Sequence, residues 1–462
     1  MADDDLRFER RMSDSDALLW RVERDPLLRS TITSVAFFDA PFDHERLDHG
    51  IERATRLVPR LRQRVLSSPV SPSPPRWVVD PGFDLRYHVR YAQAPGSGTM
   101  REVLDMAEPM AMQGFDRARP LWEFTIVDGV DGGRSALIAK IHHSITDGVG
   151  AVKLWMNLVD LEREPAELPP MPDAPLPERP GILERIADSV EHERRRQLGI
   201  AKRTLENIGR LAVKPTETAA QGAANAASAA RLLAPAFAPL SPVMTGRSLS
   251  VRFDTLSFPT DELKAAARRA EGKLNDAFVA GVAGGLHRYH RHHGADVDAL
   301  RMTMPISVRS EEDLGLAGNA FVPARFPVPI AEADPVDRMR AVRALVEQQR
   351  REPSLGFSEA IAGVLNRLPV WVVTDVFGRM LKGIDLVTSN VPGVPIPVYM
   401  AGAKLESQFA FGPLAGSAMN LTLLSYLDEC QIGVNVDPAA VPDLDVLLAC
   451  LRESFDEIRK VA

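Results

Sequence analysis

Seven prolines lie between residues 165 and 181, and this run limits what can fold on either side of it. They are Pro165, Pro169, Pro170, Pro172, Pro175, Pro177 and Pro180. Proline fixes φ and has no backbone N–H, so a run this dense excludes both a helix and a central strand. We therefore predict an extended connector from Pro165 to Gly181. Because 462 residues exceed what one ordinary hydrophobic core can organise, the connector is expected to separate two folded units.

The apolar pattern predicts mixed α/β structure on both sides of the connector. Strand-like and helix-like periods alternate from Met12 to Glu164, which is typical of an α/β unit. The second unit is predicted to open with a half-buried strand at Ser248–Phe253, where polar and apolar residues alternate. A helix capped by Thr260 should follow, and an apolar helix at 444–455 should close the chain. The expected segments are 1–164, 165–247 and 248–462.

Two segments after the prolines do not have the composition of a hydrophobic core. Leu183–Val213 is charged and helix-prone, and Ala219–Ala238 is rich in alanine but interrupted by glycine and proline. We interpret both as parts of the linker between the two units.

The charges and the cysteines exclude several classes of function. A formal net charge of −7 lacks the dominant basic field of a nucleic-acid-binding protein, so no nucleic acid partner is expected. The two cysteines, Cys430 and Cys450, form no cluster with metal-ligand spacing, so we expect a reducing cytoplasm and no metal. The N-terminus, Met1–Asp5, carries three aspartates where a secretory signal would be basic, and no apolar run could span a bilayer, which predicts a soluble or peripheral protein.

The sharpest chemical feature is the segment His142-His143-Ser144-Ile145-Thr146-Asp147-Gly148. It follows two β-prone runs, Trp122–Val127 and Arg134–Ile141, which a turn-rich segment should join as a hairpin. The histidines are therefore expected at the end of a strand. Since neighbouring strand residues point to opposite faces, only one of His142 and His143 should face a shared cavity.

Asp147 is expected where the strand gives way to a helical pattern that includes Val152 and Trp155. At this point two interpretations stay open. The segment either carries catalysis or holds a buried histidine pair followed by a helix-capping aspartate. A metal site is the weaker interpretation, because one histidine and one aspartate supply only part of a ligand set.

The pattern His142-His143-x-x-x-Asp147-Gly148 resembles the HHxxxDG motif of the wax ester synthase/diacylglycerol acyltransferase family and of peptide-synthetase condensation domains. Other passages resemble the first family and occur in its order. These passages are Met12–Ala17, Pro120-Leu121-Trp122-Glu123, Asn275-Asp276, Pro305–Arg309 with Gly318-Asn319, Ser389–Gly393 with Tyr399 and Ala401–Ala403, and Asn420-Leu421-Thr422. The resemblance covers the chain from about Met12 to the C-terminus.

This resemblance implies two chloramphenicol-acetyltransferase-like α/β domains that face each other across a tunnel, with the active site between them. It implies an O-acyltransferase that moves a long-chain acyl group from acyl-CoA to diacylglycerol or a long-chain alcohol. Acyl-CoA would be a co-substrate, and neither a cofactor nor a covalent intermediate is expected. The lipid acceptor implies a cytoplasmic enzyme that works at the inner membrane or at lipid droplets.

His143 is the predicted general base, because a neutral imidazole can take the hydroxyl proton and return it to the CoA thiolate. The resemblance implies that Asp147 is structural and binds an arginine. Arg62 is our candidate, since alternation of Arg60, Arg62 and Arg64 along a strand would place all three on one face.

The other predicted site residues each have a structural alternative. His142 packs or orients the site if His143 is the base. Asn275 either stabilises an oxyanion or caps the helix that follows it. Trp122 either contacts the substrate or packs in its strand. The further candidates for substrate binding are Gly148, Pro120, Leu121, Ser389 and Asn390.

Two other functions compete with lipid acyl transfer. One is a condensation-type ester or amide synthase that uses a carrier-bound acyl donor, and the other is a non-catalytic lipid-binding relative. Both are less expected, because no attached carrier domain is expected and the histidine motif is intact. Contact with a lipid surface is expected from the basic residues Arg194–Arg196 and Lys202-Arg203 together with the apolar Leu232–Phe237. The alternative is a solvated helix and a flexible tether.

Overall fold

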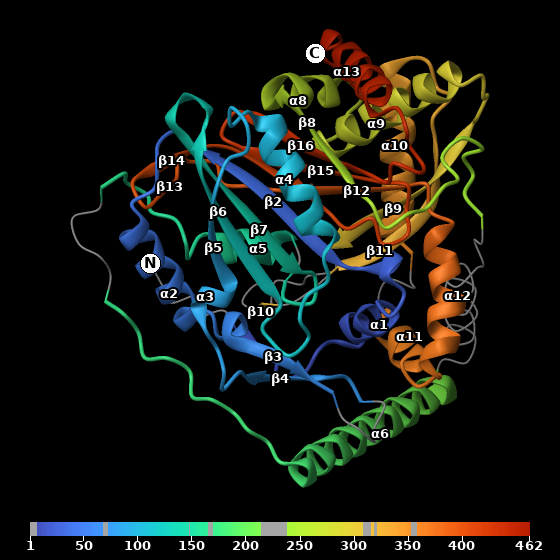
Figure 1. Ribbon diagram of the computed structural model, residues 1–462. Coiled ribbons are helices and arrows are strands. Elements are labelled where there is room, and N and C mark those ends of the chain that lie inside the picture. Colours follow the sequence, from blue (N-terminus) through green and yellow to red (C-terminus); the bar gives the residue numbers. More distant parts are fainter. Residues whose placement is uncertain are drawn as a thin grey trace.

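Two six-stranded sheets form the centre of the computed structural model, and helices pack around them (Figure 1). The structure describes residues 7–67, 73–146, 148–164, 170–213, 238–307, 316–317, 321–352 and 358–462. Two small sheets pair β1 (Arg7–Phe8) with β10 (Leu316–Ala317) and β3 (Gln63–Leu66) with β4 (Arg76–Val79). The predicted mixed α/β fold is confirmed.

The first sheet has the strand order β13-β14-β2-β7-β6-β5. Its strands are β13 (Tyr399–Met400), β14 (Ala403–Phe411), β2 (Thr31–Phe38), β7 (Arg134–His142), β6 (Trp122–Val130) and β5 (Val89–Gln93). β6 and β7 are antiparallel neighbours joined by the turn η3 (Asp131–Gly133), which confirms the predicted hairpin. Gly132 and Gly133 have φ values of 70° and 75°, a conformation that glycine adopts without steric cost.

Part of the first sheet comes from the far end of the chain. β14 pairs antiparallel with β2, and Gln408 Nε2 donates a hydrogen bond to Ser34 Oγ across this pair at 3.0 Å. β13 then extends the same edge. The C-terminal segment therefore completes a sheet whose other strands lie between residues 31 and 142. The sequence did not predict this exchange, because residue alternation identifies a strand but not its distant partner.

The second sheet has the order β11-β9-β12-β15-β16-β8. Its strands are β11 (Phe321–Pro329), β9 (Ala299–Ser307), β12 (Leu386–Val391), β15 (Met419–Tyr426), β16 (Glu429–Val436) and β8 (Arg252–Pro259). β12 runs parallel to both of its neighbours, and the other pairs are antiparallel. Four helices share a buried core with this sheet. They are α8 (Thr260–Arg269), α9 (Leu274–His292), α10 (Pro335–Arg350) and α13 (Leu444–Lys460), of which α13 confirms the predicted closing helix.

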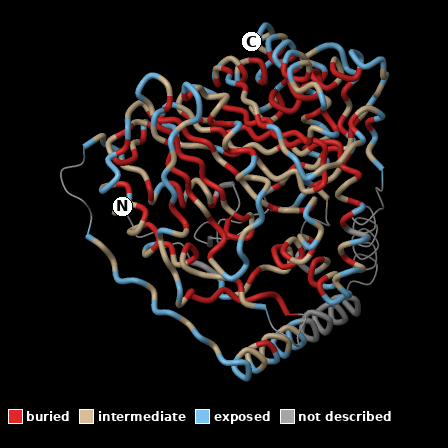
Figure 2. The backbone as a smooth tube through the Cα atoms, in the orientation of Figure 1, coloured by how far each residue is buried: buried red, intermediate tan, exposed pale blue. Residues whose placement is uncertain are grey.

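The first sheet is covered on both faces because alternate residues of β2 enter different cores. Val35 and Phe37 pack with α4 (Met100–Met112), whereas Ala36 and Phe38 pack with α2 (His44–Leu57). The remaining short helices are α1 (Asp14–Val22), η1 (Pro26–Leu28), η2 (Pro59–Arg62), α3 (Leu85–His88), α5 (Gly148–Trp155), α11 (Ser358–Leu365) and α12 (Val370–Lys382). Figure 2 shows the buried residues concentrated in the two sheets and the faces turned toward them.

The described part of the connector, residues 170–181, has no regular secondary structure and runs around the outside of the first unit to α6 (Ile182–Val213) (Figure 1). Ion pairs hold this path. Arg76 Nη2 lies 2.7 Å from Glu178 Oε2, and Arg11 Nη2 lies 2.5 Å from Asp188 Oδ2. The helix predicted at Leu183–Val213 is confirmed, while residues 219–237 of the alanine-rich segment lie outside the described residues.

Three local predictions were wrong for identifiable reasons. The strand expected at Ser248–Phe253 begins only at Arg252. Ser248 Oγ donates to Asp437 Oδ1 at 2.6 Å, and this bond holds the backbone before Arg252 away from the neighbouring strand. The segment containing Arg60 and Arg62 is the 3-10 helix η2 rather than a strand, since Pro59 favours a helical start. Thr260 begins α8 without capping it.

Replacement of Phe411 by alanine should destabilise both units together. Phe411 is 1% exposed at the end of β14 and stacks on Phe253 of β8 with ring centroids 4.1 Å apart, so one ring joins the two sheets. We expect the variant to lose about 3 to 5 kcal/mol of unfolding free energy. Urea denaturation of Phe411→Ala measures the loss, with Leu249→Ala, at a 53% exposed position, as the control. Separate unfolding of the units with one of them unaffected would contradict the prediction.

Candidate active site

A cavity of about 300 Å³ lies between the two sheets. The first sheet lines it with side chains of β2, β6, β7 and β14, and the second sheet lines it with side chains of β9, β11, β12 and β15. Most of the lining side chains are apolar; examples are Ile32, Phe124, Leu154, Val387 and Leu424. A cavity of this kind suits a ligand with a hydrocarbon chain.

His143 lines this cavity directly after the end of β7. Its backbone N–H donates to the carbonyl oxygen of Ser30 at 2.8 Å, and Ser30 stands one residue before β2. The antiparallel ladder pairs Thr31 with His142, so the bond from His143 to Ser30 continues the ladder by one step. Backbone pairing therefore fixes where His143 enters the cavity.

His142 lies in a separate, buried environment. Its side chain is 2% exposed and meets the ring of Trp20 edge-on, with centroids 5.4 Å apart. Nε2 is 2.8 Å from Glu23 Oε1, and Nδ1 is 2.7 Å from Ser144 Oγ. Of the two histidines, only His143 is among the residues lining the cavity.

The hydrogen bonds of His142 define its tautomer. The backbone N–H of Ser144 donates to Nδ1 at 3.0 Å, so Nδ1 is an acceptor and the ring proton resides on Nε2. Nε2–H then donates to the carboxylate of Glu23. Burial alone would raise the pKa of Glu23, but the His142 ring, the Ser30 N–H and Arg117 together hold this pKa below its usual value.

Asp147 lies outside the described residues. Gly148 begins α5, whose residues Ala151, Val152, Leu154 and Trp155 line the cavity. The helix predicted after the histidine motif is therefore present and forms part of one wall. Trp155 Nε1 has no hydrogen-bond partner within the described part of the chain.

Arg62 contacts three described residues, and its predicted contact with Asp147 stays a prediction because Asp147 is not described. Its Nε donates to Thr55 Oγ1 at 3.0 Å, and Nη2 pairs with Glu52 at 2.5 Å. The guanidinium also lies over the ring of Phe83 at 4.4 Å. These contacts anchor η2 to α2.

Asn275 is the second residue of α9 and is not among the residues lining the cavity. Its Nδ2 donates to Met304 Sδ at 3.7 Å, a contact that directs it toward β9. The helix-capping interpretation was wrong, because Lys273 occupies the N-cap and its N–H is satisfied by the Asp276 carboxylate at 2.7 Å. A role for Asn275 in stabilising an oxyanion stays a prediction.

Pro120, Leu121 and Trp122 are buried behind the histidines and do not line the cavity. The carbonyl oxygen of Leu121 accepts the N–H of His142 at 2.9 Å. Trp122 Nε1 donates to Leu61 O at 2.7 Å. This motif therefore supports the end of β7 from the neighbouring strand.

The second sheet contributes a group of polar side chains to the cavity. Ser389 of β12 lines it, whereas its neighbour Asn390 does not. The parallel pairing of β12 with β15 places Ser389 opposite Thr422, which also lines the cavity and donates to Asn420 Oδ1 at 3.0 Å. Thr303 of β9 lines the same wall, and its Oγ1 has no hydrogen-bond partner in the described ranges.

Sequence reasoning missed several residues of this site. Ser30 and Ser34 line the cavity together with Ile32, and their two-residue spacing on β2 was a readable signal. Glu23 had no such signal, because it reaches His142 across 119 positions of sequence. Among the described residues, no group of three or more His, Cys, Asp or Glu side chains is placed to hold a metal ion.

The depressed pKa of Glu23 predicts a pH-dependent contribution to stability. A carboxylate whose folded pKa lies below its unfolded value of about 4.3 stabilises the fold above that value and loses this contribution as the pH falls through the folded pKa. The Tm of the wild type should therefore exceed that of Glu23→Gln above about pH 4.3. The difference should shrink on further acidification. A difference that stays constant from pH 7 to pH 3 would contradict this linkage.

Two family models match the chain. The wax ester synthase/diacylglycerol acyltransferase catalytic domain matches residues 12–278, and the C-terminal domain of the same family matches residues 317–459. Together these matches cover the histidine segment, the first sheet and every strand of the second sheet except β9.

Curated relatives match over nearly the whole chain. A putative diacylglycerol O-acyltransferase of Mycobacterium tuberculosis (strain H37Rv) is 37% identical over 453 residues, which cover 97% of this chain and 91% of the relative. A second putative diacylglycerol O-acyltransferase of the same strain is 29% identical, and the match covers 98% of each chain.

Solved structures share the fold at lower identity. A wax ester synthase/diacylglycerol acyltransferase from Marinobacter aquaeolei VT8 has a TM-score of 0.63 at 21% identity, over 97% of this chain and 98% of that one. The first condensation domain of the CDA synthetase has a TM-score of 0.59 at 16% identity, over 97% and 96%. The family models and the 37% identical relative show that the chain belongs to the wax ester synthase/diacylglycerol acyltransferase family.

Proposed function

We propose that the protein transfers a long-chain acyl group from acyl-CoA to the hydroxyl of diacylglycerol or of a long-chain alcohol. The observation that carries this proposal is the position of His143 on the wall of an apolar cavity between the two sheets. The family matches supply the reaction class, and the cavity supplies the chemistry of the substrates.

The proposed reaction uses two substrates and one general base, and it needs no cofactor. The imidazole of His143 takes the proton of the acceptor hydroxyl while its oxygen bonds to the thioester carbonyl carbon. The tetrahedral intermediate then collapses, the carbon–sulfur bond breaks, and the imidazolium returns the proton to the departing CoA thiolate. The products are an ester and free CoA, and His143 regains its starting form.

The cavity lining suits both lipid substrates. Apolar walls would hold the acyl chain and keep water from the thioester. Trp155 and Thr303 line the cavity, and neither Trp155 Nε1 nor Thr303 Oγ1 has a hydrogen-bond partner among the described residues, so we assign both as donors to ester or carbonyl oxygens. Diacylglycerol offers more such oxygens than a simple alcohol. A panel of acceptors assayed with one long-chain acyl-CoA would establish the preference.

Replacement of His143 by alanine should abolish most transfer while the protein stays folded. Loss of a general base costs typically about 10² to 10⁴ in rate. His142→Ala should cause smaller and mixed losses, because that side chain supports the site from the buried side. The assay follows both lipid ester and free CoA.

Circular dichroism and the Tm serve as controls for folding of these variants. A folded His143→Ala protein with wild-type turnover would remove the proposed mechanism. A wild-type protein that binds lipid but produces no free CoA would favour a non-catalytic relative, and turnover only with a carrier-bound donor would favour a condensation-type synthase.

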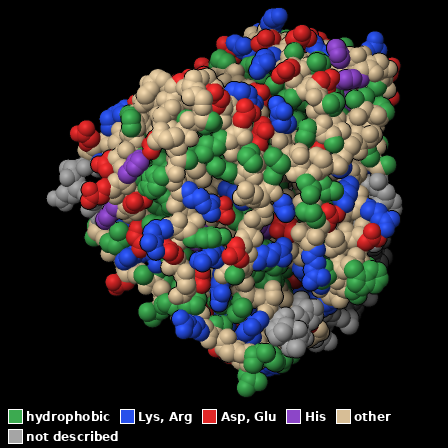
Figure 3. All heavy atoms as spheres, viewed as in Figure 1, with side chains coloured by type: hydrophobic (Ala, Val, Ile, Leu, Met, Phe, Trp, Pro, Cys, Tyr) green, Lys and Arg blue, Asp and Glu red, His purple; other side chains and the backbone are tan. Residues whose placement is uncertain are grey.

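Contact with a lipid surface is the second part of the proposal, since diacylglycerol resides in lipid. No helix within the described ranges is both long and apolar enough to cross a bilayer. Figure 3 shows cationic and anionic side chains interspersed over the visible face, so on this face a local patch is a better candidate than the face as a whole.

The arginines of the basic segment of α6, Arg194–Arg196, are paired with carboxylates, so less positive charge is available to a lipid surface than the sequence indicates. Arg194 and Arg195 both pair with Glu191 at 2.7 Å, and their hydrogen bonds lower the pKa of Glu191 to about 2. Arg196 pairs with Asp14 at 3.2 Å. The side chains of Lys202 and Arg203, and the whole segment 232–237, lie outside the described residues.

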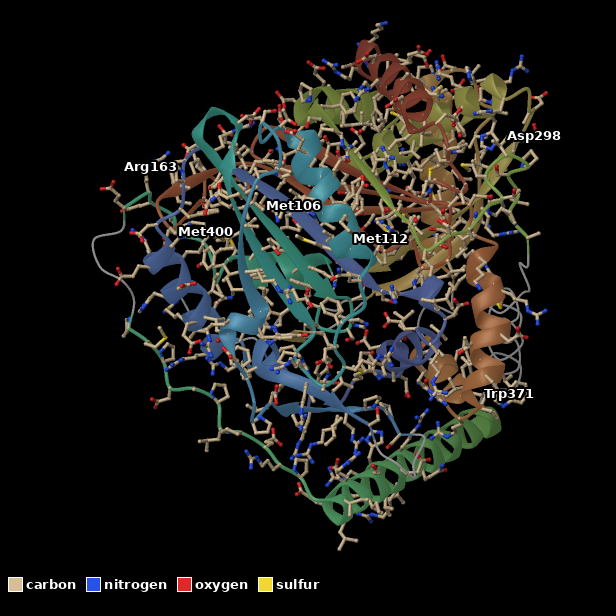
Figure 4. The ribbon with its side chains drawn as sticks, viewed as in Figure 1. Met106, Met112, Arg163, Asp298, Trp371 and Met400 are labelled. Atoms are coloured by element: carbon tan, nitrogen blue, oxygen red, sulfur yellow. The ribbon has the colours of Figure 1, made fainter. Side chains whose placement is uncertain are left out.

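Beside α6, three apolar side chains of α11, α12 and the turn between them are exposed. This α12 patch consists of Val364 at 64%, Leu368 at 40% and Trp371 at 74% exposure. Figure 4 places Trp371 at the end of α12 near α6, and Arg367 joins the two by pairing with Glu193 at 2.8 Å. An exposed tryptophan beside arginines is suited to the interface of an anionic lipid surface.

The α12 patch should be required for binding to lipid vesicles. Trp371→Asp should weaken flotation with anionic vesicles that contain diacylglycerol, because a charge replaces the side chain that enters the interface. Leu161→Asp is a matched control, since Leu161 is 57% exposed next to Asp160, which bridges to β13. Charge reversal at Arg194 and Arg195 should make the binding less sensitive to salt. Equal flotation of the two aspartate variants would assign lipid contact to another surface.

A further inference from the structure

The carboxylate of Glu23 touches both elements that hold the predicted base in place. Glu23 stands at the C-terminal end of α1, and 8% of its side chain is exposed. Its Oε1 accepts hydrogen bonds from His142 Nε2 at 2.8 Å and from the backbone N–H of Ser30 at 2.6 Å. One oxygen atom therefore joins α1, the end of β7 and the residue before β2.

Both partners of the Oε1 atom of Glu23 are attached directly to His143. His142 is its neighbour in the chain, and the carbonyl oxygen of Ser30 accepts the His143 N–H at 2.8 Å. The Ser30 peptide is consequently bonded on one side to Glu23 and on the other to His143. Ser144, which follows His143, donates its N–H to the ring of His142 at 3.0 Å. The backbone on both sides of His143 is thus tied to the ring that Glu23 holds.

The second carboxylate oxygen has a different and more exposed partner. Oε2 lies 3.3 Å from Nη2 of Arg117, a side chain that is 45% exposed and stacks over the ring of Trp20 at 4.0 Å. This ion pair orients the carboxylate without touching the histidine segment. The two oxygens therefore have separate partners: Oε1 binds His142 and the Ser30 peptide, and Oε2 pairs with Arg117 at the surface.

We propose that Glu23 is a positioning residue that sets the place of His143 in the cavity through His142 and the Ser30 peptide. It touches neither substrate, since it is not among the residues that line the cavity. The inference rests on the proposed acyl transfer, and it assigns a role to a residue outside the histidine motif.

Two conservative variants separate geometry from charge. Glu23→Gln retains a carbonyl oxygen that can occupy the place of Oε1 and accept both bonds, but it loses the charge. Glu23→Asp keeps the charge and withdraws the carboxylate by one methylene, so neither bond can form at its present length. If positioning is the role of Glu23, the glutamine variant should retain more of the activity than the aspartate variant.

The expected effect is on kcat rather than on KM. A displacement of about 1 Å in a reacting group can cost about 10²-fold in rate, so Glu23→Asp and Glu23→Ala should lose about 10- to 100-fold in kcat. Their KM for acyl-CoA should stay within about threefold of the wild type. Glu23→Gln should restore kcat to within about tenfold of the wild type. Rates are normalised to folded protein.

Glu108→Ala is the matched control for loss of a buried carboxylate. Glu108 lies on α4, is 8% exposed, accepts the N–H of Phe253 at 2.9 Å and also pairs with an arginine. Like Glu23, it accepts a backbone N–H and pairs with an arginine, but it makes no hydrogen bond to the described residues of the histidine segment. We expect Glu108→Ala to lower the Tm and to leave kcat per folded molecule unchanged.

Histidine-selective ¹⁵N NMR provides a readout that is independent of turnover. The wild type should show His142 as the Nε2–H tautomer, Glu23→Gln should keep this signal, and Glu23→Asp should shift it. An aspartate variant with full kcat and an unshifted His142 signal would overturn the inference, as would a glutamine variant less active than the aspartate variant. Absence of acyl transfer in the wild type would instead reject the proposed function.

Discussion

The backbone pairing of β2 with its two neighbours is the constraint on which the rest of the structure depends. β7 on one side ends at the histidines, and β14 on the other side comes from the C-terminal part of the chain. Because β2 is hydrogen-bonded to both, the end of β7 and the cavity-lining residues of β14 keep a fixed relation. The cavity thus owes its first wall to main-chain bonds, which do not depend on side-chain identity.

The two adjacent histidines lie in different environments because a strand directs successive side chains to opposite faces. His142 enters a polar, buried network with Glu23 and Ser144, while His143 enters an apolar cavity. The first environment is rigid, since each polar atom of the His142 ring has a partner. The second leaves room for a ligand. Rigidity behind a reactive group and space in front of it are the usual requirements for precise general-base chemistry.

The sequence predicted the local features well, because they depend on neighbouring residues. The β6–β7 hairpin, the helix after the histidine motif and the closing helix α13 all follow from periodicity and turn residues. The long-range features were not readable. Neither the entry of β14 into the first sheet nor the contact between Glu23 and His142 leaves a pattern in adjacent residues. The error at Pro59–Arg62 arose because three arginines at alternate positions imitate a strand, whereas the proline before them starts a 3-10 helix.

The strand supplied by the C-terminal segment has a consequence for synthesis on the ribosome. Asp39, just beyond β2, and Lys404 of β14 are hydrogen-bonded across 365 positions of sequence. At about 5 to 20 residues per second, β2 emerges on the order of 20 to 70 s before its partner strand exists. For that interval the nascent chain carries an open strand edge, of the kind that pairs with other chains. The first sheet is therefore unfinished until β14 has been synthesised, so its completion depends on a segment that follows most of the second sheet in the chain.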